Sequence, residues 1–194
     1  KTRQKMLNSA ARLLAERGDH GLTIESLISE ADVSRGTFYN YWDSREELVN
    51  ALWDHVGHNP FAAMQAAHNQ VEDHAERLSI IARHSIRQAA KDATWGWLVI
   101  YIAESEHIFH HELISYPSSE LEAAMKAERV RVESFAAARD MIVGTTIAGM
   151  RQLLRNKESD NYPECLVALM LRALGLNRRD AKEVVGRPLP PLDI

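Results

Sequence analysis

The sequence has 194 residues, 45% hydrophobic and 26% charged, which is the balance of an ordinary globular protein with one or two small domains. Its formal net charge of -4 argues against a protein that coats nucleic acid or an anionic membrane through bulk positive charge. It contains neither an apolar run long enough to span a bilayer nor the apolar segment of a signal peptide, so we expect a cytoplasmic protein without membrane association.

The N-terminal segment predicts an amphipathic helix. Apolar residues recur at helical spacing from Met6 to Leu14, and Gly18 is a C-terminal stop signal. Basic residues outnumber the single acid, Glu16, in this segment, and they either contact phosphate or are simply solvated. These basic residues are Lys1, Arg3, Lys5, Arg12 and Arg17.

Three short helices are predicted next, each opened by a capping residue. Thr23 is an N-cap, with Ser26 at the capping-box position, before an apolar stripe of about eight residues. Ser34 caps the second of these helices, which lasts only about two turns, and Ser44 with Glu47 forms a capping box for the third. Two short helices joined by a tight turn behind a longer helix form a helix-turn-helix, whose second helix lies in the DNA major groove.

The second short helix, "SRGTFYNYW" (34–42), is rich in aromatic residues. Phe38 and Trp42 lie one helical turn apart and form its apolar pair, so both are predicted to lie in the core. Tyr41 shares a face with Phe38 and is either exposed or mostly buried with only its hydroxyl in water. The other side chains project elsewhere; they are Arg35, Thr37, Tyr39 and Asn40.

The stretch "TIESLISEADVSRGTFYNYWDSREELVNAL" resembles the DNA-binding signature of the TetR family of transcriptional regulators, and the resemblance covers about Met6 to Val56. It implies an all-α homodimer in which three N-terminal helices bind a near-palindromic DNA operator. A larger C-terminal helical domain would bind a small effector and dimerise. We therefore expect a helix-turn-helix domain over residues 1–57 and a helical effector-binding and dimerisation domain over residues 58–194.

The same resemblance assigns candidate DNA contacts. It implies that Arg35, Gly36 and Thr37 approach bases, that Tyr39 and Tyr41 contact phosphates, and that the arginine of "SREEL" clamps the DNA backbone. The chemistry agrees, because an arginine forks to guanine O6 and N7, a glycine lets the backbone come close, and helix N-termini offer amides to phosphate. The full candidate set is Thr23, Ser34, Arg35, Gly36, Thr37, Tyr39, Asn40, Tyr41 and Arg45.

The rest of the chain predicts long helices. Residues 61–91 read as one amphipathic helix, and "TWGWLVIYIAESE" is apolar nearly all round, which places it at the centre of the second domain. Pro117 is expected to break the chain, and the long helical pattern that starts at Glu120 is expected to bend near residues 134–138. Gly144 and Gly149 then allow a close helix or a ligand.

The last predicted helix runs from Pro163 to Gly175 and contains Cys165, the single cysteine, which is expected to be a buried thiol in a reducing compartment. By resemblance this helix and its neighbour over residues 141–154 form a four-helix dimer interface, which burial of their apolar faces also favours. The Pro-rich tail "GRPLPPLDI" is expected to be irregular.

Three groups of residues in the second half are candidate sites. Large and polar side chains on converging helices suggest a pocket for a small, mostly apolar effector, although such residues are also typical of an ordinary core. His107, His110 and His111 have the spacing of metal ligands but lack a secure fourth ligand, so neither metal nor cofactor is expected. Glu104 and Glu106 lack an accompanying nucleophile motif, so we do not expect an enzyme. The candidate effector-binding residues are Phe61, Met64, His84, Trp95, Trp97, Tyr101, Met141 and Thr145.

Together these features predict a ligand-responsive transcriptional regulator, read as a repressor, that binds double-stranded DNA as a homodimer. The alternative is a DNA-binding regulator without a small-molecule effector, whose second domain serves only dimerisation or protein recruitment. A small enzyme that carries a helix-turn-helix is a third class.

Overall fold

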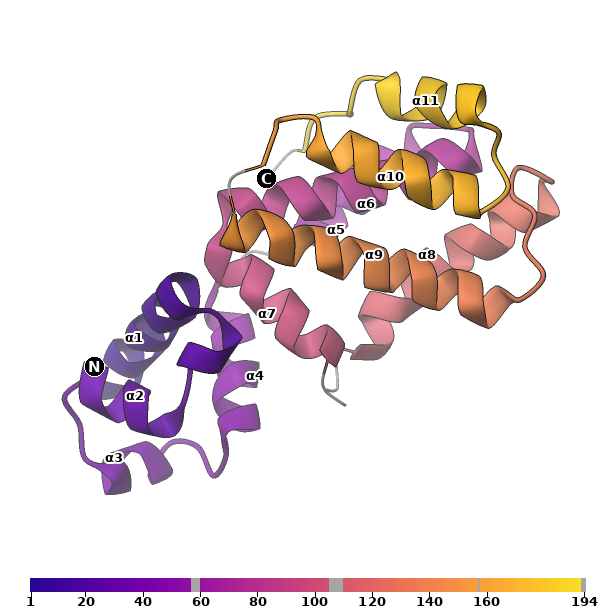
Figure 1. Cartoon of the computed structure of the whole chain (residues 1–194). Coiled ribbons are helices and arrows are strands. Elements are labelled where there is room, and N and C mark those ends of the chain that lie inside the picture. The colour runs from indigo at the N-terminus through magenta and orange to yellow at the C-terminus, as the bar shows by residue number, and fades with distance from the viewer. Residues whose placement is uncertain (57–59, 105–109, 157, 193–194) are drawn as a thin grey trace. The chain divides into compact units, whose positions relative to one another are not determined.

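The computed structural model describes residues 1–56, 60–104, 110–156 and 158–192, and within these ranges all regular structure is helical (Figure 1). The predicted all-α fold is thus confirmed. None of the described helices combines the length and apolar composition needed to cross a bilayer. The chain forms two compact units, of which unit 1 contains Lys1–His58 and Asp92–His107 and unit 2 contains Asn59–Lys91 and Ile108–Ile194.

Unit 1 contains the predicted helix-turn-helix. Its helices are α1 (Thr2–Arg17), the short 3-10 helix η1 (Asp19–Gly21), α2 (Ile24–Glu30), α3 (Arg35–Tyr39), α4 (Arg45–Val56) and α7 (Ala93–Glu104). Helix α1 packs against α2, α4, α7 and η1 and is therefore the central helix of the unit. The core between them is mostly apolar, with Ser9 of α1 also buried, and includes Met6, Leu13, Leu27, Phe38, Leu48, Leu52 and Trp95.

Helix α7 belongs to unit 1 although it follows α6 in the chain. The Thr94 hydroxyl donates to the Ala11 carbonyl at 3.2 Å, and the Trp97 indole lies against Gly18, where an added Cβ would come within 3.1 Å of the ring. Gly18 ends α1 with a φ of 71°, a conformation that favours glycine. The expectation that this apolar helix is the centre of the second domain is therefore wrong, because its indoles complete the core of unit 1.

Unit 2 is built around α6 (His74–Lys91). The other helices are α5 (Pro60–Asn69), α8 (His110–Lys126), α9 (Phe135–Arg155), α10 (Tyr162–Ala173) and α11 (Arg178–Gly186), and α6 packs against each of them (Figure 1). Such a central helix would ordinarily be apolar, yet α6 buries several polar side chains as well as apolar ones. The buried polar residues of α6 are Glu76, Ser79, Arg83, His84, Ser85 and Gln88.

Two predicted helix boundaries are wrong. Residues 61–91 form two helices rather than one, because the Asp73 carboxylate accepts a hydrogen bond from the Ala75 amide at 3.0 Å and starts α6 afresh. Pro117 does not break the chain but lies inside α8, buried. His107 and the side chains of His110 and His111 lie outside the described residues, so their predicted spacing stays without a structural account.

The C-terminal part confirms the bend and adds a helix. The long pattern divides into α8 and α9, with Ser134 accepting from the Ala137 amide as the N-cap of α9. Helix α11 was not predicted; Asn177 caps it by accepting from the Asp180 amide at 2.9 Å. Cys165 is exposed, which contradicts the expected buried thiol, because α10 turns its other face to the core.

Candidate functional site

Helix α3 is short and capped at its start by its own side chains. The Ser34 hydroxyl accepts a hydrogen bond from the Thr37 amide at 3.0 Å and lies 2.8 Å from the Thr37 hydroxyl. Both hydroxyls are therefore engaged in the cap. The amides of Arg35 and Gly36, which precede the first intrahelical hydrogen bond, lie at the exposed end of the helix where an anion would meet them.

The aromatic residues of α3 divide as the helical spacing predicts. Phe38 is fully buried and its ring lies 5.7 Å from that of buried Trp42, so the prediction that this pair belongs to the core is confirmed. Tyr39 and Tyr41 are 42% and 43% exposed. Tyr41 was predicted to be either exposed or mostly buried, and the structure supports the exposed alternative. Phe38 and Trp42 thus hold this segment in unit 1, while Tyr39 of α3 and Tyr41 just after it expose their phenolic side chains.

Arg35 is exposed but has a partner. Its guanidinium lies 3.2 Å from the Glu25 carboxylate on α2 and 5.9 Å from the centre of the Tyr39 ring. The Tyr39 hydroxyl and then the charge of Glu25 raise the pKa of Arg35. Sequence reasoning missed Glu25, which lies in the first turn of α2.

Gly36 is exposed in α3, and the protein itself does not require a glycine there. The nearest atom to an added Cβ would be the Ser34 Oγ at 3.8 Å, an ordinary contact distance. A glycine inside a helix costs up to about 1 kcal/mol relative to alanine. Its presence is therefore explained better by something that approaches α3 from outside than by packing within unit 1.

The other candidate DNA contacts differ in how much of their side chain is already used. Thr23 forms a reciprocal capping box with Ser26, and Asn40 is exposed just after α3. Arg45 is half-buried: its Nε donates to the Leu22 carbonyl at 2.7 Å and its guanidinium lies 4.6 Å from the centre of the Tyr101 ring. Its contact with DNA stays a prediction, but its contacts in unit 1 already give it a structural role.

The eight candidate effector-binding residues fall into both units. Trp95, Trp97 and Tyr101 belong to α7 of unit 1, where the two indoles are buried and the phenol lies under Arg45. The other five belong to unit 2. There Met64 and His84 are buried, and the half-buried members are Phe61, Met141 and Thr145.

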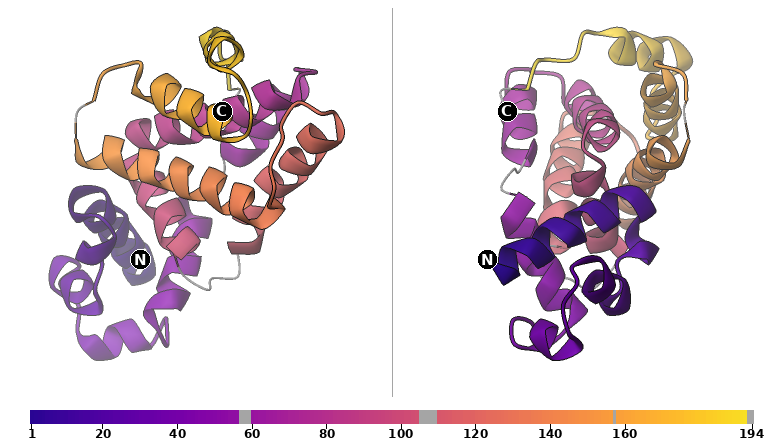
Figure 2. Two further views of the ribbon diagram at one scale, coloured as in Figure 1. Left: turned by 45° about the vertical axis from the view of Figure 1, so that its right-hand side comes forward. Right: turned by 90° about the vertical axis from the view of Figure 1, so that its left-hand side faces the viewer.

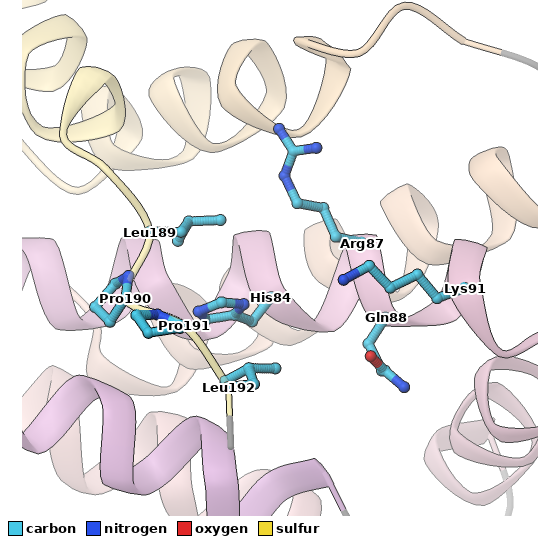
Figure 3. A pocket seen from close by; sticks show the side chains of 8 residues that line it. All are labelled: His84, Arg87, Gln88, Lys91, Leu189, Pro190, Pro191 and Leu192. Atoms are coloured by element: carbon cyan, nitrogen blue, oxygen red, sulfur yellow. The ribbon is translucent and has the colours of Figure 1, made fainter. Parts of the chain in front are cut away.

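One of these eight residues lines a pocket within unit 2. His84, Arg87, Gln88 and Lys91 of α6 form its floor, and the tail segment Leu189–Leu192 forms its wall (Figure 3). Its volume is about 260 Å³. The tail is irregular over residues 188–192, as predicted. Sequence reasoning missed its role as a wall because nothing in the tail itself indicates which helix it crosses.

Comparison with known proteins places both parts of the chain in one family. Residues 6–52 match the family described as "Bacterial regulatory proteins, tetR family", and residues 73–187 match "Tetracyclin repressor-like, C-terminal domain". The chain belongs to the TetR family.

Individual TetR-family relatives are more distant. The regulator BetI of Brucella anthropi is 26% identical over 102 residues, which are 52% of this chain and 53% of BetI. The repressor KstR2 of Rhodococcus jostii is 27% identical over 116 residues, which are 60% of this chain and 56% of KstR2. The chain thus spans little more than half the length of these curated relatives.

A solved TetR-like structure covers nearly the whole chain. RolR in complex with the ligand resorcinol superimposes with a TM-score of 0.74 and 28% identity, covering 99% of this chain and 96% of RolR. RolR without ligand superimposes with a TM-score of 0.69 and 26% identity over 98% of this chain. The likeness therefore includes both the N-terminal and the C-terminal parts of the fold.

In this TetR-family chain, α9 and α10 run side by side in unit 2 (Figures 1 and 2). Gly149 faces inward, where an added Cβ would come within 2.8 Å of Ile86, so the predicted close helix approach is confirmed at this glycine. Gly144 faces outward, with no atom within 4 Å of its added Cβ. Leu169 on α10 is 60% exposed, and Phe135 at the start of α9 is also exposed.

Replacing Gly36 by alanine should weaken DNA binding by about tenfold or more without loss of stability. The methyl group fits within unit 1, and the better helix propensity should raise the free energy of unfolding by up to about 1 kcal/mol. Urea unfolding and a DNA titration by fluorescence anisotropy measure the two effects. Gly186→Ala at the end of α11, where an added Cβ also meets open space, is the matched control and should leave DNA affinity unchanged. Equal DNA affinity of Gly36→Ala and wild type would contradict the close approach of DNA to α3.

Replacing Glu25 by glutamine should strengthen DNA binding by roughly threefold to tenfold at low salt. The exposed pair with Arg35 contributes little to stability, but the carboxylate competes with DNA for the guanidinium and repels phosphate. Anisotropy titrations at several salt concentrations measure the gain, which should shrink as salt rises. Glu122→Gln, which breaks the exposed pair with Lys126 on α8, is the control. A weaker complex in Glu25→Gln would mean that Glu25 itself helps to hold DNA.

Burial lowers the pKa of His84 to about 4 from 6.5, with a smaller opposing effect from a hydrogen bond to the backbone of Pro190. Below pH 6.5 the unfolded chain binds a proton at His84 that the folded chain does not bind. This residue therefore lowers the free energy of unfolding as pH falls. Between pH 7 and pH 5 the loss should be about 2 kcal/mol. Urea unfolding at both pH values should give a correspondingly smaller pH difference for His84→Asn than for wild type, and an identical difference would place His84 in a less buried environment.

Proposed function

We propose that the protein is a ligand-responsive transcriptional repressor that binds a near-palindromic DNA operator as a homodimer. The observation that carries this proposal is the exposed side of α3 and of the turn that follows it, where Arg35, Gly36, Tyr39 and Tyr41 are exposed while Phe38 and Trp42 are buried. Membership of the TetR family supports it.

On the DNA, α3 would lie in the major groove. Arg35 would leave Glu25 and fork to a guanine, Gly36 would admit the duplex backbone, and the two tyrosine hydroxyls would bond phosphates without adding positive charge. The other candidate contacts, Thr23, Ser34, Thr37, Asn40 and Arg45, would position the helix. Local contacts of this kind suit a chain with a net charge of -4.

The dimer would form through the exposed faces of α9 and α10. Among the described residues, the exposed large hydrophobic side chains are Tyr39 and Tyr41 beside the proposed DNA face, and Phe135 and Leu169 on these two helices. Exposed apolar residues on paired helices favour burial against a second copy in a four-helix arrangement. Two α3 helices in a dimer would then read half-sites about 34 to 36 Å apart.

The effector would be a small, mostly apolar molecule bound in the C-terminal part. RolR, which matches nearly the whole chain, is known with resorcinol as its ligand, and this supports a small-molecule effector here. An effector that binds one arrangement of the two DNA-binding units better than another would shift the equilibrium between them. Release from the operator would follow when the favoured arrangement no longer fits successive major grooves.

Mobility shift and anisotropy with the purified protein and the DNA upstream of its own gene test the DNA-binding part. We expect specific binding that falls steeply with salt, because phosphate contacts release counterions. A thermal-shift screen of small apolar metabolites tests the effector part, since a ligand of the native state raises the melting temperature. Absence of salt-sensitive binding would refute the proposal that the protein is a DNA-binding regulator. DNA binding that no screened compound alters would favour a regulator without an effector.

A further inference from the structure

The C-terminal tail is fastened across α6 by buried polar groups of that helix. The Arg83 guanidinium, which is almost fully buried, donates to the carbonyls of Val185 at 2.7 Å and Arg187 at 3.1 Å. Arg187 in turn pairs with Asp73 and Glu76 near the start of α6. These contacts fix the end of α11, and the tail segment Leu189–Leu192 then passes over α6.

The pocket under this tail contains a buried polar atom without a partner. His84 is only 8% exposed, although it carries a polar ring. Its Nε2 atom is buried and has no hydrogen-bond partner among the described residues. A neutral imidazole carries its proton on one ring nitrogen and presents the other as an acceptor. Leaving that acceptor buried and unsatisfied costs free energy, which a donor on a bound molecule would recover.

The rest of the pocket supplies one positive charge, one amide and an apolar wall. Gln88 and Lys91 follow His84 at intervals of four and three residues, so the three share a face of α6. Figure 3 shows the Lys91 side chain extending back along α6 toward His84, whereas Arg87 points away from it. Arg87 is engaged by the Glu164 carboxylate at 2.7 Å, which leaves Lys91 as the cation beside the pocket. Leu189 and Leu192 of the tail give the wall its apolar character.

We propose that this pocket binds a small organic carboxylate that carries a hydroxyl group. The hydroxyl donates to Nε2 of His84, the carboxylate pairs with the Lys91 ammonium, and the hydrocarbon part lies against Leu189 and Leu192. This inference rests on the proposed function in one respect, because it names the chemical class of the effector. Binding at the pocket is nevertheless measured without DNA, so its failure would leave the DNA-binding proposal untouched.

Calorimetric titration of the full chain with 3-hydroxybenzoate, benzoate and 3-hydroxybenzyl alcohol tests the two polar contacts. We expect 3-hydroxybenzoate to bind, and the two probes that lack one group each to bind about tenfold more weakly. Spectra of ¹⁵N-histidine-labelled protein give a second readout, because hydrogen bonding to Nε2 shifts its resonance. Loss of a signal in His84→Asn assigns that resonance. Absence of 3-hydroxybenzoate binding at millimolar concentration would overturn the proposal.

Two variants separate the pocket from other surfaces. His84→Asn keeps a donor near the position of Nδ1 and removes the Nε2 acceptor, so it should weaken 3-hydroxybenzoate binding about tenfold and leave benzoate binding unchanged. Lys91→Met keeps the aliphatic stem on the surface and should weaken both carboxylates. Lys126→Met on α8, which removes another exposed lysine, is the control. Binding that neither pocket variant changes would place the probe elsewhere and refute the assignment.

Discussion

Replacing Arg35 by alanine should reduce specific operator affinity on the order of 10²-fold. A bidentate arginine–guanine pair contributes about 1–3 kcal/mol, and a dimer loses it in both half-sites. Stability should change by less than about 0.5 kcal/mol, because the side chain is exposed and its pair with Glu25 is at the surface. Anisotropy titrations with operator and with unrelated DNA measure the loss, which should be much larger for the operator.

Two further variants distinguish base reading from charge. Arg35→Lys keeps the positive charge but loses the planar fork, so it should recover nonspecific binding and little of the specificity. Arg178→Ala removes an exposed arginine from α11 in unit 2 and should change neither. Full recovery of specific affinity by lysine would mean that Arg35 contacts phosphate rather than a base.

Replacing Leu169 by glutamate should dissociate the proposed dimer, raising its dissociation constant about 10³-fold. Leu169 is 60% exposed in the single chain, so the change costs the monomer little. In the proposed interface each copy would bury one carboxylate without a partner, and burying an unpaired charge costs several kcal/mol. Sedimentation equilibrium measures the change in mass, and operator affinity should fall with it because one half-site binds alone.

Ala66→Glu is the matched control for that variant. Ala66 is an exposed apolar residue on α5, so the substitution adds the same charge to another helix of unit 2. It should leave the mass unchanged, and circular dichroism should report equal helix content in both variants. A dimeric Leu169→Glu protein would move the interface away from the exposed face of α10.

The arrangement of α3 was predictable because its signals are local. Ser34 fixes where the helix begins, and the helical period then decides that Phe38 and Trp42 face the core. The starts of α6 and α11 have similar signals, since Asp73 and Asn177 each precede a helix as a capping residue. Local chemistry therefore accounts for most helix boundaries, including those that were missed.

The effector pocket was only partly predictable because its parts are distant in the sequence. His84 was a candidate, yet the tail that covers it comes from the end of the chain, and its Pro-rich sequence carries no period that indicates a partner. The prediction that α7 lies at the centre of the second domain failed for a different reason. A helix that is apolar all round has no polar face to show its orientation. Its Trp97 therefore fits a ligand wall and a core equally well until Gly18 is seen beside it.

The inclusion of α7 in unit 1 affects how DNA specificity can be transferred between relatives. The α1–α7 contacts at Ala11 and Gly18, and the stacking of Arg45 on Tyr101, join segments that are separated in the chain by α5 and α6. A chimera that exchanges only the first 56 residues would pair one protein's α1 with another protein's α7. Exchanging the DNA-binding domain of this chain therefore requires two segments to be replaced together. The residues of α7 that contact α1 must be exchanged along with α3.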